Sequence, residues 1–93
     1  MRFGLDLTIF GELADPALLV ELAVDAEAAG WDGFFLWDHV VTADAGHVTD
    51  PWVVLSAAAA RTQRLRLGPM VTPLARRRMS KLARETVALD HLS

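Results

Sequence analysis

An acid and a histidine stand side by side at Asp38 and His39, directly after an apolar run at residues 34–37. A run that is apolar at every position is typical of a parallel strand that is covered on both faces. Such a strand would end at these two residues, on the side of the sheet where α/β proteins place their chemistry. An imidazole can exchange a proton near neutral pH, so we take the pair as a candidate site.

The same pair could also belong to a metal cluster, which would be drawn from Asp38, His39, Asp44, His47 and Asp50. Zinc or another divalent ion needs two or three converging ligands that a second set of residues holds in place. The spacing of these five side chains matches no compact metal signature. We therefore expect no metal site, and a metal-dependent hydrolase is kept as a third hypothesis.

The elements that must position this pair alternate between strands and helices. Alternation and apolar runs predict strands at residues 3–8, 34–37 and 65–72. Asp15-Pro16, Asp50-Pro51 and Ser80 each have the composition of a helix start. The third helix would supply a buried side from Leu82, Ala83, Thr86, Val87 and Leu89. The order β-α-β-α-β-α predicts right-handed crossovers and a parallel sheet. At roughly 30 residues per unit, we expect an α/β fold that is part of a TIM barrel, with residues 1–93 forming three consecutive β-α units.

Two local features refine these elements. Gly30 is placed to end the first helix in a left-handed conformation, which glycine adopts without a steric penalty. Gly68 and Pro69 lie inside the third predicted strand, where the missing N–H of proline predicts a bulge or another irregularity. Three units do not close a barrel, so we expect surfaces that meet further barrel units or a second copy of the chain.

Composition narrows the class of protein. The chain of 93 residues is 53% hydrophobic and contains no cysteine, which excludes disulfides and thiolate-bound metals. It has neither an apolar run long enough for a bilayer nor a secretory leader, so we expect a cytoplasmic protein without a membrane partner. Residues 1–50 carry ten acids and one Arg, a net −9, and residues 51–93 carry eight basic and two acidic groups, a net +6. No aromatic residues are interleaved with the arginines, so we expect no nucleic-acid partner.

Several segments together resemble a known family. They are residues 28–40 (AAGWDGFFLWDHV), 50–55 (DPWVVL), 62–73 (TQRLRLGPMVTP), 76–78 (RRR), 81–85 (KLARE) and 89–93 (LDHLS). In this order they are similar to the amino-terminal third of the luciferase-like family of flavin- and deazaflavin-dependent oxidoreductases. The likeness covers nearly the whole chain. One departure is Met79, which stands where family members usually have proline.

The resemblance implies a planar redox cofactor, FMN or coenzyme F420, at the carboxyl ends of the strands, together with a small-molecule substrate. It places His39 beside the cofactor ring, where the imidazole would balance protons or stabilise charge. Asp38 would then hold the tautomer and orientation of that imidazole. The phosphate-binding segments of family members lie mostly in later barrel units, beyond the part that this chain resembles.

The resemblance also implies a non-prolyl cis peptide in the third strand that buttresses the ring, expected by position at Met70–Val71. Trp37 ends the second strand and could touch the ring. The cofactor contacts expected from this chain are therefore Trp37, Met70, Val71 and Thr72.

Other residues have a plainer interpretation beside a functional one. We expect Asp6 to be a buried hydrogen-bonding group and His91 to favour the helix dipole near a helix end. Trp31 and Trp52 are expected in the core or at an interface. Arg76, Arg77 and Arg78 could approach a cofactor phosphate, although a solvated run of charge is the plainer expectation.

A second hypothesis from another class stays open beside the oxidoreductase. In it the chain is a non-catalytic barrel segment, whose first and third strands present unpaired edges to another copy or another subunit.

Overall fold

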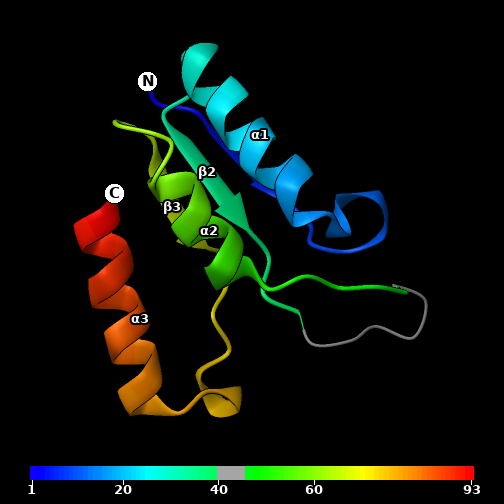
Figure 1. Ribbon diagram of the computed structural model, residues 1–93, viewed down its shortest axis with the longest axis vertical. Coiled ribbons are helices and arrows are strands. Elements are labelled where there is room, and N and C mark those ends of the chain that lie inside the picture. The colour runs from blue at the N-terminus through cyan, green and yellow to red at the C-terminus, as the bar shows by residue number, and fades with distance from the viewer. Residues whose placement is uncertain (40–45) are drawn as a thin grey trace.

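A computed structural model describes residues 1–39 and 46–93. Within these residues, three parallel strands form one sheet in the order β1-β2-β3, and each strand is followed by a helix (Figure 1). The strands are β1 (Gly4–Leu7), β2 (Gly33–Leu36) and β3 (Arg66–Pro69). The helices are α1 (Pro16–Ala28), α2 (Pro51–Ala59) and α3 (Met79–Leu92), with short 3-10 turns at Gly11–Ala14 and Leu74–Arg76. The expected β-α-β-α-β-α order and parallel sheet are confirmed.

The first two helices begin where the sequence predicts. The Asp15 carboxylate accepts hydrogen bonds from the backbone N–H of Ala17 at 2.9 Å and of Leu18 at 3.4 Å. The Asp50 carboxylate accepts one from the N–H of Val53 at 3.0 Å. Each acid satisfies backbone donors that the first turn of a helix leaves without a partner, which stabilises the helix end by about 1 kcal/mol.

The start of α3 differs from the prediction. The helix begins at Met79, and the flanking residue is Arg78, with extended backbone at φ −72° and ψ 124°. Ser80 therefore lies inside the first turn and is not the cap, because a capping residue must stand outside the helix with non-helical backbone. Met79 occupies the first helical position, the place where proline is also favoured.

The hydrophobic core lies between the sheet and the helices on one of its faces. Phe34 and Leu36 of β2 are fully buried, and they pack among buried residues of α1 and α2 that include Leu19 and Leu55. Figure 1 shows α1 and α2 lying side by side over this face. We expected β2 to be covered on both faces, but Phe35 on the opposite face is only half-buried. In the described residues α1 and α2 lie over one face of the three-stranded sheet, and Phe35 stands on the other, which explains the difference.

This opposite face of the sheet carries small residues around one aromatic ring. The Phe35 ring lies over Gly4 and Gly33, so close that a Cβ atom at Gly33 would stand 2.7 Å from Phe35 Cε2. On the same face Asp6 is exposed, which corrects the expectation that it is a buried hydrogen-bonding group. A similar correction applies to α3, where we expected Val87 on the buried side and find it 55% exposed.

The third strand pairs with β2 residue for residue, from Gly33 with Arg66 to Leu36 with Pro69, so the predicted bulge is not formed there. Arg66 N donates to Asp32 O at 3.0 Å and Met70 N to Leu36 O at 2.7 Å. The backbone N–H groups of β3 that point toward β2 thus belong to every second residue. Pro69 is one of the residues between them, whose backbone nitrogen points away from β2. Its missing N–H therefore leaves the ladder intact. The irregularity follows directly, as a cis peptide at Met70–Val71, the expected position.

At the amino ends of the strands, Glu27 fastens the chain that enters β3. Its carboxylate accepts hydrogen bonds from the backbone N–H of Gln63 at 3.0 Å, Arg64 at 2.8 Å and Leu65 at 2.9 Å. These donors, with that of Arg64 contributing most, lower the pKa of Glu27 below its ordinary value of 4.5. The Gly30 backbone, with φ +92°, then turns the chain from α1 toward β2, as expected.

In the described part of the chain, every helix falls short of the length and apolar character that crossing a bilayer demands.

Candidate functional site

Side chains alternate across the sheet as the chain leaves the carboxyl end of β2, and this alternation separates the two residues of the candidate pair. Trp37 and His39 lie together, with ring centroids 5.2 Å apart. Asp38 points away from them toward the helices, where its side chain is only 3% exposed. A period of two residues sends neighbours in an extended chain to opposite sides. Asp38 and His39 are neighbours in sequence, but the extended backbone sends their side chains to opposite sides.

A third aromatic residue joins this site, and sequence reasoning missed it. The Phe10 ring lies edge-on to His39, with centroids 5.9 Å apart, and 6.3 Å from the centroid of Trp37. Phe10 lies just past the end of β1, where Val48 pairs with it through an isolated antiparallel bridge. A sequence signal was present, because polar and aromatic residues after each strand of a parallel sheet converge at one edge.

The rings of Trp37 and His39 form one wall of a cleft at the carboxyl ends of the strands. The cleft has a volume of about 400 Å³. It is lined by Trp37, Asp38, His39, Met70, Val71 and Pro73. Five of the six predicted site residues are thus brought together, while Thr72 is not part of the lining. Val71 is 73% exposed, so the second wall presents an apolar surface to solvent.

The imidazole of His39 has an orphaned nitrogen. Its Nδ1 atom is buried, and within the described residues it has no hydrogen-bond partner. Among the described residues, the Asp38 carboxylate accepts hydrogen bonds from Arg76 and Arg77 and not from His39, so the predicted contact is not formed. Buried polar atoms are nearly always hydrogen-bonded in native proteins, so this nitrogen is an exception, on a residue that lines the cleft.

Asp38 instead binds two arginines that follow β3. Its Oδ2 atom accepts hydrogen bonds from Arg77 Nη2 at 2.6 Å and Nε at 3.1 Å. Arg76 Nη2 lies 3.3 Å from Asp38 Oδ1 and also donates to the Asp38 carbonyl at 2.9 Å. The expectation of a solvated arginine run holds for the exposed Arg78. It is wrong for Arg77, whose side chain is 19% exposed.

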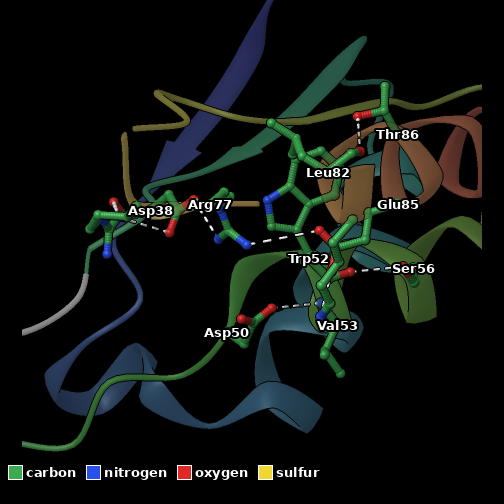
Figure 2. Close-up of polar contacts among 11 residues, drawn as sticks. Asp38, Asp50, Trp52, Val53, Ser56, Arg77, Leu82, Glu85 and Thr86 are labelled. Carbon is green, nitrogen blue, oxygen red and sulfur yellow. Dashed lines mark hydrogen bonds and ion pairs between the residues drawn. The ribbon is translucent and has the colours of Figure 1, made fainter. Parts of the chain in front are cut away.

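Two helices hold Arg77 in this position. Figure 2 shows its guanidinium between the Asp38 carboxylate and the side chain of Trp52 on α2. The guanidinium carbon lies 5.8 Å from the centroid of the Trp52 ring, a cation–π distance. Glu85 of α3 approaches Arg77 Nη1 at 3.9 Å. The buried charge of Asp38 is thus compensated by a partner that is itself fixed on several sides.

The metal hypothesis gains no geometric support. In residues 1–39 and 46–93, no group of three acids, histidines or cysteines could hold an ion. Asp44, one member of the drawn cluster, lies outside the described residues. Asp38 is engaged by arginines, and His47 is exposed.

Comparison with known proteins gives the family. A family model described as luciferase-like monooxygenase matches residues 1–93. A curated relative, the F420-dependent glucose-6-phosphate dehydrogenase of Nakamurella multipartita, is 42% identical over 81 residues, which cover 82% of this chain and 23% of that protein.

Among solved structures, the chain resembles the oxygenating constituent of 3,6-diketocamphane monooxygenase from the CAM plasmid of Pseudomonas putida, a type II Baeyer–Villiger monooxygenase in complex with FMN. The TM-score is 0.84 at 22% identity, over 99% of this chain and 26% of that one, and this likeness shows the fold. The chain spans about a quarter of the length of both proteins. From the match along its whole length, the chain belongs to the family of luciferase-like monooxygenases.

Proposed function

We propose that this chain supplies the His39 side of the cofactor site in an oxidoreductase that uses F420 or FMN and acts on a small organic substrate. The relative that is 42% identical is named F420-dependent, and the structural neighbour is a complex with FMN. F420 has the stronger support, because the likeness to the FMN complex, at 22% identity, concerns the fold. The activity of the whole protein is part of the proposal.

One observation carries the proposal, which is the place of the His39 imidazole in the lining of a mostly apolar cleft. Cofactor sites are mostly apolar clefts with a few placed polar groups, and this cleft has that character. The ring of Trp37 and the aliphatic side chains of Met70 and Val71 offer flat, apolar surface to a planar ring system. His39 offers a single nitrogen to a polar edge of such a ring. The residues present therefore fit a flavin or deazaflavin.

The bound cofactor would supply two-electron redox chemistry, and the protein would supply binding, orientation and proton handling. Trp37, Met70 and Val71 would bind the ring and exclude water from one side of it. The His39 imidazole would donate or accept the proton that accompanies the redox step.

The non-catalytic alternative rests on open strand edges alone, whereas family membership and the cleft favour an oxidoreductase. Association with further barrel units or with a second copy stays a prediction.

Titration of the full-length protein with F420 and with FMN, followed by cofactor fluorescence, tests the proposal. We expect saturable binding of one of the two. The His39→Ala variant should bind it more weakly, while His91→Ala, a change at an exposed histidine on α3, should bind it as the unmodified protein does. Absence of binding with both cofactors would contradict the proposal.

A further inference from the structure

The two walls of the cleft come from different strands, and the ladder that joins those strands ends below the cleft. Residues 37–39 follow β2, and residues 70–73 follow β3. The last backbone hydrogen bond between the two strands in the described chain runs from Met70 N to Leu36 O at 2.7 Å. Above this bond, the separation of the two walls depends on other contacts.

Asp38, Arg76 and Arg77 provide such a contact, which we call the Asp38 clamp. Both oxygens of the carboxylate lie within 3.3 Å of a guanidinium nitrogen, and the Asp38 carbonyl accepts a further hydrogen bond from Arg76. Charge-assisted hydrogen bonds from guanidinium to carboxylate are strong and directional. The clamp therefore connects the chain after β2 with the chain that continues from the second wall.

The clamp is also anchored to the helices. Arg77 contacts the ring of Trp52 near the start of α2 and the carboxylate of Glu85 on α3, as Figure 2 shows. Arg77 thus cannot follow a movement of either wall without breaking contacts to a helix. A side chain fixed in this way can set the position of Asp38.

From this geometry we infer that Asp38 is a positioning residue, which acts through Arg76 and Arg77 to set the separation of the cleft walls and to present His39 to the cleft. The inference rests on the proposed function, because one of its tests measures the affinity for the cofactor. Asp38 stands between Trp37 and His39 in extended chain, so its side chain and theirs point to opposite sides. Holding Asp38 against the helices therefore holds the two rings toward the cleft.

The experiment compares Asp38→Asn, Arg77→Met and the double variant in the full-length protein, well below the melting temperature. Each single variant should raise the Kd of F420 or FMN about 10- to 100-fold, because misplacement of a binding group by about 1 Å has effects of this size. The Kd of the double variant should lie within about threefold of the Kd of the more weakly binding single variant, because both changes break the same clamp. The His39 imidazole NMR signals of the cofactor-free protein should shift in Asp38→Asn.

Glu27→Gln is the matched control. This change weakens a carboxylate contact at the opposite end of the sheet, so it should lower the melting temperature and leave the Kd within about twofold. A merely structural role for Asp38 would produce the same pattern in Asp38→Asn, with unmoved His39 signals, and would overturn the inference.

The two proposals fail in different ways. If the unmodified protein binds neither F420 nor FMN, the proposed function is wrong, while the NMR signals of His39 still decide whether the clamp positions the imidazole. If Asp38→Asn does not fold, Arg77→Lys replaces it, since lysine keeps the charge and loses the forked geometry. An Arg77→Lys protein with unchanged Kd and unmoved His39 signals would contradict the inference.

Discussion

Glu27 and Asp38 are carboxylates at opposite ends of the same sheet, and each fastens a segment next to β3. Glu27 binds the backbone N–H groups of residues 63–65, which enter the strand. Asp38 binds the guanidinium groups of Arg76 and Arg77, which follow it. The donors at the amino end are backbone groups that most residue types could supply, whereas those at the carboxyl end are particular side chains.

The difference indicates how the two ends are used. At the amino end, Asp32 further accepts a hydrogen bond from the N–H of Phe3 at 2.9 Å, so polar groups there serve to join strands and helices. At the carboxyl end, the buried Asp38 carboxylate is held by two arginine side chains, and His39 is part of the lining of a cleft. Barrel enzymes keep chemistry at the carboxyl end and stability at the amino end, and our proposal gives this chain the same division.

The largest expected effect is at the carboxyl end. His39→Asn should lower the turnover of the full-length enzyme about 100-fold or more, because a general acid–base group contributes on this scale. Its melting temperature should change by less than about 2 °C, since the imidazole is not part of the hydrophobic core. Turnover and thermal melting check this, with His91→Asn as the control. Full turnover in His39→Asn would contradict the view that the carboxyl end of the sheet carries the chemistry.

At the amino end, Gly33→Val should lower the free energy of unfolding by about 1–3 kcal/mol, because the added side chain overlaps the Phe35 ring. Chemical denaturation measures this cost. The control is Gly68→Ala, whose Cβ would meet Phe35 Cδ1 at an ordinary contact distance of 3.6 Å. Cofactor affinity should change little in either variant. A change in affinity with unaltered stability would show that the ends are not separate.

Glu27→Gln should lower the free energy of unfolding by about 1–2 kcal/mol at neutral pH, through weaker hydrogen bonds to the backbone of residues 63–65. Because folding lowers the pKa of Glu27, its contribution is present above the ordinary value of 4.5 and is lost as the pH falls through the folded-state pKa. The stability difference between Glu27→Gln and the unmodified protein should therefore be full above about pH 4.5 and shrink as the pH falls through the lowered pKa of Glu27. A difference that stays constant over this range would refute the role given to the charge.

The smallest effect is expected at the exposed ion pair of Arg61 and Glu21, which joins the turn after α2 to α1. Both side chains are about half exposed, and exposed ion pairs contribute little to stability because solvent screens them. Arg61→Met should therefore leave the melting temperature and the cofactor affinity nearly unchanged, as thermal melting and cofactor titration would show. A larger loss would mean that helix pairing, rather than either end of the sheet, limits stability.

Much of the fold followed from local signals. The Asp-Pro starts of α1 and α2, the left-handed Gly30 and the order of elements are confirmed because each depends on residues close in sequence. The start of α3 was predicted wrongly, since Ser80 has the right side chain but the backbone is already helical there. Val87 was assigned to a buried face by its apolar character alone, and the packing of α3 leaves it exposed.

The candidate site was predictable in membership but not in its contacts. Strand ends of a parallel sheet meet at one edge, so Trp37, His39 and Met70 could be grouped from the sequence. The partner of Asp38 could not, because Arg77 lies 39 positions away and competes with the adjacent His39.

The sequence by itself determined which residues form strands and helices, and that an acid and an imidazole stand at the end of the middle strand, because propensity, capping and alternation act over short distances. Only the tertiary structure decided that Asp38 turns to the arginines and His39 to the cleft. The physical reason is that the pleat of the chain separates neighbours, while the burial of Asp38 requires a compensating charge that the folded chain brings from the segment after β3.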